Sequence, residues 1–245
     1  MPISVLVNGA FGRMGQMTTK AINEHPKLTL VGQTGREYNL AKAIQDSKAE
    51  VVVDFTHPDV AYQNAVTILE SGARPVIGTS GLTQEQVQKL QKIAAELKLG
   101  GVIAPNFSLG GVLMMKYAKE IARYMPNVEI IEMHHQEKAD SPSGTAMRTA
   151  EMLASAVTTL LNDPEPPSKE NIPGSRGAKY HHVPIHAVRL PGLLAHQQII
   201  FGSLGETLTL RHDTIDRLSF MPGVCLACEK VLSLDRLVLG LEALL

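Results

Sequence analysis

The first hundred residues alternate short, continuously apolar runs with longer segments in which apolar residues recur at helical spacing. The apolar runs predict strands at residues 3–7, 28–32, 51–55, 75–78 and 101–104, and the helical spacing predicts helices at 14–24, 40–45, 60–71 and 83–97. Continuous apolar runs are typical of strands that are covered on both faces. The alternation therefore predicts an α/β domain with a doubly wound parallel sheet.

The pattern changes after residue 106. Helices are predicted at 111–124 and 146–159, strands at 128–133, 182–190, 197–201 and 207–212, and a further helical segment at 222–245. Leu208 and Leu210 alternate with polar neighbours, which favours a sheet with one exposed or interface face. The proline- and glycine-rich segment 162–179 predicts a surface loop or lid. These elements indicate a second part in which helices and a sheet are mixed.

Composition narrows the class of protein. The 245 residues are 44% hydrophobic and 19% charged with a formal charge of −1, which gives no electrostatic reason to expect nucleic acid or an anionic membrane as a partner. No apolar run approaches the ~18 residues of a membrane span, and the first residues lack the basic region of a signal peptide. Two cysteines exclude a disulfide framework. We therefore expect a soluble cytoplasmic protein.

Cys225 and Cys228 form a C-x-x-C pair, which is a motif of thiol–disulfide enzymes when the first thiol is exposed at a helix start. The favoured interpretation is that both are small apolar residues, one turn apart on one face of a helix.

A glycine pattern follows the first predicted strand and precedes the first helix. Gly9, Gly12 and Gly15 form G-x-x-G-x-x-G, with Phe11 where the commoner G-x-G-x-x-G has its middle glycine. Glycines here allow a tight turn and a close approach of the backbone to a pyrophosphate at the helix N-terminus. The position predicts a Rossmann-like dinucleotide site, although a glycine turn without a ligand is the alternative.

The end of the second strand bears on the choice of cofactor. It has no acidic residue for a ribose 2′-hydroxyl, and Arg36 could instead bind a 2′-phosphate, which favours NADPH over NADH although Glu37 is adjacent. Segments 78–81 and 104–107 follow later strands and could lie near a nicotinamide, or could simply be turns. The expected cofactor-binding residues are Gly9, Ala10, Phe11, Gly12, Arg13, Met14, Arg36, Gly78, Thr79, Ser80, Ala104, Pro105, Asn106 and Phe107.

A second group of functional side chains follows the strand at 128–133. His134, His135 and Lys138 are followed by a Ser-Gly-Thr turn at 143–145 that opens a helix. Imidazole, a fixed cation and free backbone N–H groups are what is needed to hold a carboxylate and deliver a proton. Taken singly, each of these features also occurs on ordinary surfaces and helix caps.

Motifs along nearly the whole chain resemble those of the 4-hydroxy-tetrahydrodipicolinate reductases, long called dihydrodipicolinate reductases, of lysine and diaminopimelate biosynthesis. They are the glycine turn 9–15, the segments 54–56, 78–81 and 106–108, and above all the segment 132–146. The resemblance implies reduction of a cyclic imine dicarboxylate with NADH or NADPH. From the spacing of possible ligands, no metal is expected.

By position, the resemblance assigns an acid–base role to His134 and the role of proton donor or cationic partner to Lys138. His135 would bind the substrate, while Gly144 and Thr145 would hold one of its carboxylates. This chemistry agrees with the residues, because hydride addition leaves negative charge that a nearby acid neutralises.

The resemblance also implies an architecture. Residues 1–107 with 215–245 would form the dinucleotide-binding domain, and residues 108–214 would form a mixed α+β domain for substrate binding and tetramerisation, with a hinge between the two. The chain departs from the family pattern at Gly35, where some members have an acid, at His57, where an arginine is frequent, and at Ser141, where alanine is usual. It is also shorter than many relatives between the second and third strands.

Three alternatives remain open. A redox-sensing nucleotide-binding protein would explain the glycine turn but would leave His134 and Lys138 without a role. A metal-dependent hydrolase could use the late histidines, but Pro184 interrupts the pair His182 and His186, and no carboxylate lies at ligand spacing. A reductase acting on a different imine or enoate is the third.

Overall fold

The structure is a computed structural model that describes residues 1–157, 161–164, 167 and 169–245. It divides into two compact units, Met1–Leu109 with Arg217–Leu245, and Gly110–Asp216. The domain boundaries expected from the resemblance lie two residues before each of these breaks. No helix in the described residues is long and apolar enough to span a membrane.

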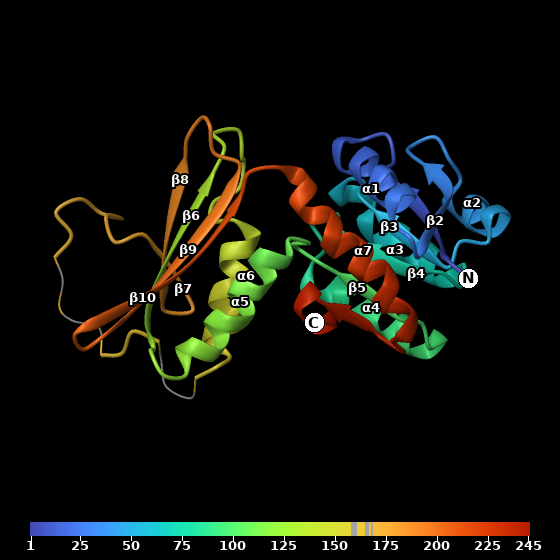
Figure 1. Cartoon of the computed structure of the whole chain (residues 1–245). Coiled ribbons are helices and arrows are strands. Elements are labelled where there is room, and N and C mark those ends of the chain that lie inside the picture. Colours follow the sequence, from blue (N-terminus) through green and yellow to red (C-terminus); the bar gives the residue numbers. More distant parts are fainter. Residues whose placement is uncertain (158–160, 165–166, 168) are drawn as a thin grey trace. The chain divides into compact units, whose positions relative to one another are not determined.

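The first unit contains one parallel sheet (Figure 1). Its strands are β1 (Ile3–Asn8), β2 (Leu28–Thr34), β3 (Val51–Asp54), β4 (Arg74–Ile77), β5 (Gly101–Ile103) and β11 (Leu237–Leu239), in the order β11-β5-β4-β3-β1-β2. Its helices are α1 (Arg13–Glu24), α2 (Leu40–Ser47), α3 (Pro58–Glu70), α4 (Gln84–Leu97) and α7 (Met221–Lys230). All neighbouring strands pair in parallel. The predicted doubly wound, Rossmann-like fold is confirmed.

Helices cover both faces of this sheet, as the apolar runs predicted. Leu6 and Val52 form one core with residues of α2, α3 and α4. Val5, Val7 and Val53 alternate with them on the other face and are completely buried. On that face, α1 and α7 pack together, and the Thr18 hydroxyl of α1 lies 3.8 Å from the Met221 sulfur of α7.

The prediction that residues 222–245 are helical throughout is wrong. Helix α7 ends at Lys230, Leu234 is extended (φ −94°, ψ 149°), and β11 adds a sixth strand beside β5. Gly240 then adopts φ +88°, which no helix contains. A three-residue apolar strand is too short to show a period of its own, so the pattern could not separate it from a helix.

The C-x-x-C pair lies on α7, and its interpretation as apolar packing is confirmed. Cys225 is 6% exposed and Cys228 is completely buried. Burial, with a smaller effect from the nearby Glu229 carboxylate, raises the pKa of Cys225 to about 11, and burial also raises the pKa of Cys228. Neither thiol is a ready nucleophile at neutral pH.

The second unit combines a mixed sheet with two helices, as predicted (Figure 1). Its elements are α5 (Leu109–Ala122), β6 (Asn127–His134), α6 (Gly144–Ala154), β7 (Ala178–Tyr180), β8 (Val183–Arg189), β9 (Ala195–Ser203) and β10 (Glu206–Thr214). The strand order is β10-β9-β6-β8-β7, in which β6 and β8 are parallel and the other pairs antiparallel.

One face of this sheet forms the core of the second unit. Val128 and Ile130 of β6, with Ile199 and Phe201 of β9, pack against residues of α5 and α6. Leu208 and Leu210 of β10 are in register with Phe201 and Ile199, so they lie on the same face. Leu210 packs against the core, whereas Leu208 is 40% exposed, so the burial expected from the alternation holds at Leu210 but not at Leu208.

Several boundaries differ from prediction. Strand β7 begins inside the segment 162–179, which was predicted as a loop; at three residues it is held by pairing with β8 and carries no pattern of its own. Helix α6 begins two residues earlier than predicted and ends at Ala154, not Thr159. Residues 158 and 159 of the predicted helix, residue 160 after it, and residues 165, 166 and 168 of the predicted loop lie outside the described residues.

Candidate active site

The glycine turn after β1 has a backbone that other residues could not adopt. Gly9 has φ +78°, and a Cβ there would lie 2.2 Å from the Phe55 carbonyl oxygen. A Cβ on Gly15 would lie 2.0 Å from the Gly9 carbonyl oxygen. The N–H groups of Gly9 and Ala10 both donate to the Thr34 carbonyl, which fixes the turn to the end of β2.

The turn presents the start of α1. Gly12 is the N-cap and makes no side-chain cap, so the N–H groups of Arg13 and Met14 have no acceptor within the helix. Phe11, Gly12 and Arg13 are all exposed. Exposed N–H groups at the positive end of a helix are the arrangement that binds a pyrophosphate, so these residues fit a dinucleotide.

The other residues predicted to bind cofactor follow the carboxyl ends of neighbouring parallel strands. Arg36 is exposed two residues after β2, Gly78, Thr79 and Ser80 follow β4, and residues 104–107 follow β5. The strand order reverses between β1 and β3, which is where sheets of this type bind their ligands. The predicted residues therefore share one edge of the sheet.

Two of these side chains are directed inward. Phe107 is 3% exposed and packs edge-on against Phe55, with ring centres 5.7 Å apart. The Thr79 hydroxyl donates to Asp54 at 2.5 Å. Phe107 and the Thr79 hydroxyl are therefore buried beneath this edge of the sheet, while Ser80, Pro105 and the backbone of Gly78 lie at its surface.

Asp54 organises that edge, and the sequence motifs assigned it no role. Its carboxylate is completely buried and accepts from Asn8 Nδ2 at 2.8 Å and Asn64 Nδ2 at 2.9 Å. It also accepts from the Thr56 hydroxyl at 2.8 Å. One carboxylate thus joins the ends of β1 and β3 to α3 and to the turn after β4.

In the second unit, Glu132 is the centre of the site. It is completely buried on β6. Oε2 accepts from His134 Nδ1 at 2.5 Å and from Arg189 at 2.8 Å, and Oε1 accepts from Arg189 at 2.7 Å and from the Ser143 N–H at 3.2 Å. Burial acts to raise the pKa of Glu132, but the hydrogen bonds and charges of His134 and Arg189 outweigh it and lower the pKa to about 2. Glu132 is therefore an anion at neutral pH.

His134 is the last residue of β6, and its ring is 13% exposed. Because Glu132 occupies Nδ1, the other ring nitrogen, Nε2, is left without a hydrogen bond to any described residue. A half-buried imidazole with one nitrogen fixed and one free is suited to proton transfer.

Lys138 lies on the loop that follows. Its Nζ donates to Asp140 at 2.6 Å, and its backbone N–H donates to the His135 carbonyl. Burial acts to raise the pKa of Asp140, but the hydrogen bond and the positive charge of Lys138 outweigh it, so the pKa is lowered. The loop is tied to β8 because Arg189 also donates to the Asp140 carbonyl at 2.9 Å.

Gly144 and Thr145 form the first turn of α6. The Ser143 hydroxyl caps the helix by accepting from the Ala146 N–H at 3.2 Å, which leaves the N–H groups of Gly144 and Thr145 without acceptors inside the helix. A Cβ added to Gly144 would meet no atom within 4 Å. Open space therefore lies before two backbone donors, as a bound carboxylate requires.

Comparison with protein-family models covers nearly the whole chain. Residues 3–107 match the N-terminus model of dihydrodipicolinate reductase, and residues 110–245 match the C-terminus model. The chain belongs to the dihydrodipicolinate reductase family. Curated relatives named 4-hydroxy-tetrahydrodipicolinate reductase include one from Legionella pneumophila (strain Lens), 51% identical over all of both chains, and one from Coxiella burnetii, 53% identical over all of both chains.

A solved structure of the family agrees with this fold. Dipicolinate-bound dihydrodipicolinate reductase from Paenisporosarcina sp. TG-14 matches with a TM-score of 0.89 and 41% identity, covering 100% of both chains. Amine dehydrogenase from Mycobacterium smegmatis matches with a TM-score of 0.67 at 10% identity, over 99% of this chain and 96% of its own. The second likeness shows only that the fold is shared.

In this member of the family, the predicted site residues gather in two places. The cofactor-binding candidates lie at one edge of the parallel sheet, and His134, Lys138, Gly144 and Thr145 lie around the end of β6. Glu132 belonged to the recognised motif, and its spacing of two from His134 on a strand was a signal that both side chains share a face. Arg189 carried no sequence signal.

The late histidines lie elsewhere on the second sheet. His186 pairs with Glu129, and His196 pairs with Asp213, so histidine–carboxylate pairs exist that sequence spacing did not reveal. In the part of the chain that the structure describes, no group of three or more histidine, cysteine or acidic residues could hold a metal ion.

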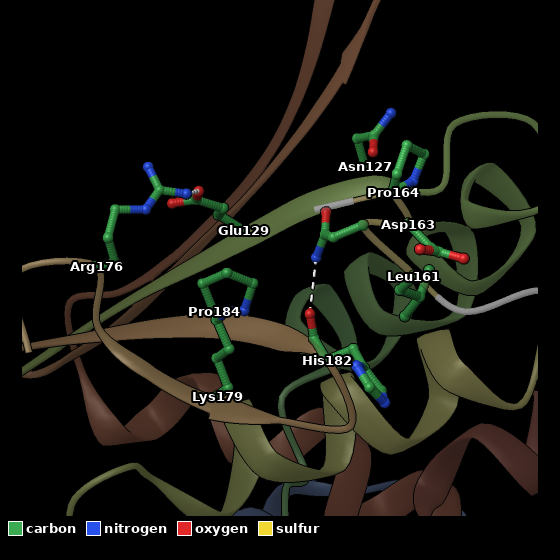
Figure 2. A pocket seen from close by; sticks show the side chains of 10 residues that line it. Asn127, Glu129, Leu161, Asp163, Pro164, Arg176, Lys179, His182 and Pro184 are labelled. Atoms are coloured by element: carbon green, nitrogen blue, oxygen red, sulfur yellow. Dashed lines mark hydrogen bonds and ion pairs between the residues drawn. The ribbon is translucent and has the colours of Figure 1, made fainter. Parts of the chain in front are cut away.

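A separate cavity of about 270 Å³ lies beside Glu129 (Figure 2). Its walls include Asn162, Lys179, His182 and Pro184. Figure 2 shows the Glu129 carboxylate facing the Arg176 guanidinium, with which it forms an ion pair. Glu129 is three residues from Glu132 on the same strand, so the two carboxylates point to opposite faces of the sheet. No predicted site residue lines this cavity.

Proposed function

We propose that this protein is a 4-hydroxy-tetrahydrodipicolinate reductase that uses a nicotinamide dinucleotide, in lysine and diaminopimelate biosynthesis. The observation that carries the proposal is the arrangement around Glu132, which fixes one nitrogen of His134 next to the open N-terminus of α6. Family membership, with relatives of this name at about half identity over the full chain, supports it.

The reaction determines what the site must do. The product has hydrogen where the substrate has a hydroxyl, so one hydride and one proton enter and one water leaves. The dinucleotide supplies the hydride when it is bound. His134 holds a proton at Nε2 for transfer to the substrate, and Lys138 supplies positive charge beside it. His135 contacts the substrate, and the N–H groups of Gly144 and Thr145 bind one carboxylate.

The dinucleotide would lie on the N–H groups at the start of α1, along the strand ends that carry residues 78–80 and 104–107. Arg36 is exposed two residues after β2, where it would lie next to the adenosine ribose. A guanidinium there favours a 2′-phosphate, so we propose that NADPH is preferred over NADH.

We further propose that the chain works as a cytoplasmic homotetramer. The sheet face opposite α5 and α6 carries Ile131, Met133, Val188 and Ile200, and all four are partly exposed. Apolar side chains that are partly exposed on a sheet face suit an interface between copies, although the same face also carries the Glu129–His186 pair. Light scattering should give four times the chain mass of 26.5 kDa, and a monomer would contradict the assembly.

The function is tested by oxidation of NADPH with freshly prepared 4-hydroxy-tetrahydrodipicolinate, compared with NADH and with His134→Gln. We expect rapid turnover that falls by about 100-fold or more in the variant while cofactor binding is kept. Cofactor binding by the wild type without turnover would refute the reductase and favour a cofactor sensor.

A further inference from the structure

Three carboxylates of the second unit each pair with one histidine and one arginine. They are Glu132 with His134 and Arg189, Glu129 with His186 and Arg176, and Asp213 with His196 and Arg211. Burial separates them, since the side chain of Glu132 is 0% exposed whereas those of Glu129 and Asp213 are 34% and 38% exposed. A buried carboxylate is held in one geometry, whereas exposed ion pairs contribute little to stability, so Glu132 is the carboxylate suited to orienting its partners.

The partners of Glu132 come from separate parts of the unit. His134 lies on the same strand, Arg189 ends β8, and Ser143 is the cap of α6. Arg189 continues the connection, because it donates to the Asp140 carbonyl and the Asp140 carboxylate accepts from Lys138. Glu132 is therefore linked directly to the His134 imidazole and to the start of α6, which would bind a substrate carboxylate. Through Arg189 and Asp140 it is also linked to Lys138.

The charge state of Glu132 fixes the tautomer of its partner. An ionised carboxylate only accepts hydrogen bonds, so the 2.5 Å contact requires a hydrogen on Nδ1. In the neutral ring, Nε2 then carries no hydrogen, and it is the nitrogen that gains and loses a proton. Without such a partner, the hydrogen could occupy either nitrogen and the ring could turn.

We propose that Glu132 is the positioning residue of this site: it holds His134 as the Nδ1–H tautomer with Nε2 free for the substrate, and through Arg189 it fixes the loop that carries Lys138. The proposal rests on the function proposed above. Glu132 acts through these partners and does not itself contact the reacting atoms.

The proposal predicts a change in pH dependence. The ionisable groups on the elements that meet at His134 are Glu132 on its own strand, Arg189 on β8, and His135, Lys138 and Asp140 on the following loop; β9 places the uncharged Ala195 opposite it. Glu132→Gln removes the negative charge in direct contact and leaves two cations nearby, which disfavours the imidazolium. We therefore expect the pH profile of kcat to differ between Glu132→Gln and the wild type.

The test uses the full-length protein. For Glu132→Gln we expect kcat to fall by about 100-fold or more, as when a carboxylate that orients a catalytic histidine is neutralised, with a much smaller change in KM. Nitrogen-15 NMR of histidine-labelled protein, with the His134 signals assigned from His134→Gln, should show the Nδ1–H tautomer in the wild type and its loss in Glu132→Gln. Glu129→Gln is the matched control, because it removes the same kind of His–Arg partner from the opposite face, and should leave kcat, the pH profile and the His134 signals unchanged.

The outcomes separate this proposal from the function itself. An Nε2–H tautomer in the wild type, or an unchanged kcat and pH profile in Glu132→Gln, would overturn the positioning role even if the substrate is reduced. An Nδ1–H tautomer that is lost in the variant would support the role even if the wild type failed to reduce this substrate. If Glu132→Gln does not fold, two measurements still test the positioning role. They are the His134 tautomer of the wild type and the kcat of an Arg189→Lys variant, which we expect to be lower by about 10-fold or more.

Discussion

Any side chain at Gly15 should destabilise the fold, for a steric reason that does not involve a ligand. In Gly15→Ala the new Cβ would stand 2.0 Å from the Gly9 carbonyl oxygen and 2.6 Å from the Ala10 Cα, both of them backbone atoms. Ordinary contact begins near 3.4 Å, so the helix and the turn would have to separate by about 1.4 Å. Gly9 cannot yield easily, because its N–H is bonded to Thr34 and a Phe55 carbonyl lies behind it.

The size of the effect follows from two opposing contributions. Overpacking costs up to about 3 kcal/mol when rigid atoms must move, whereas alanine in place of glycine inside a helix gains about 1 kcal/mol. The net destabilisation is about 2 kcal/mol, which corresponds to a melting temperature lower by about 4–8 °C for a chain of this size.

Gly12 supplies the matched comparison. It adopts φ −78°, and a Cβ there would lie 3.4 Å from its nearest neighbour, the Gly9 carbonyl oxygen. Gly12→Ala should therefore cost at most about 1 kcal/mol, the difference between glycine and alanine as an N-cap. Its methyl group would nevertheless stand beside the N–H groups that we assign to the pyrophosphate, and we expect the Kd for NADPH to rise by about 10-fold or more.

Thermal unfolding followed by circular dichroism, and fluorescence titration with NADPH, measure the two effects. Equal melting temperatures for Gly15→Ala and the wild type would refute the steric argument. Unchanged NADPH affinity in a folded Gly12→Ala would show that the turn does not approach the cofactor.

The remaining predictions concern stability, acid, thiols and cofactor choice. Asp54→Leu removes the acceptor of the buried Asn8 amide and one of the two acceptors of the part-buried Asn64 amide. It should cost about 1–3 kcal/mol by urea unfolding, more than Asp54→Asn, which keeps one acceptor; equal costs would contradict the hydrogen-bond account. The pKa of Glu132 in the folded protein is about 2, below its ordinary 4.5. The ionised carboxylate therefore contributes at most about 3 kcal/mol to the free energy of unfolding above pH 4.5, and this contribution is lost as the pH falls toward 2. Urea midpoints should fall more steeply with acid in the wild type than in Glu132→Gln. Cys225 and Cys228 should react with a thiol reagent at pH 8 only after unfolding, and rapid reaction of the folded protein would show that they are not buried. Arg36→Ala should lower kcat/KM for NADPH by about 10-fold or more and leave NADH nearly unchanged; an equal loss with both would remove the 2′-phosphate assignment.

The first sheet was predictable because its strands are buried on both faces. The run Val51–Asp54 is completely buried and is flanked by helices of clear period, so its residues alone indicate a central parallel strand. Strand β11 has only three residues, and its pairing with β5 brings together segments about 135 positions apart. Local pattern carries no information about such a pairing, so it was missed.

The cofactor edge divides in the same way. The glycine turn was predictable because φ +78° and contacts near 2 Å leave glycine as the only residue that fits. The inward direction of Thr79 and Phe107 was not, since it depends on Asp54 and Phe55, which lie on a neighbouring strand and its following loop. A hydroxyl after a strand end looks the same in sequence whether it faces a ligand or a buried carboxylate.

The connection from Glu132 to Lys138 depends on one unusual pairing in the second sheet. Strands β6 and β8 are parallel, and His134 and Arg189, the last residues of each, are directly in register. An antiparallel pairing could place Arg189 beside the start of β6, seven residues from the histidine and about 23 Å away at the rise of about 3.3 Å per residue. Parallel pairing brings both carboxyl ends to one edge, where one guanidinium reaches both the Glu132 carboxylate and the Asp140 carbonyl. In the sequence, Glu132, His134, Lys138 and Asp140 lie within nine residues of one another. Arg189 is about fifty residues away and joins them only because β8 runs parallel to β6 in this register.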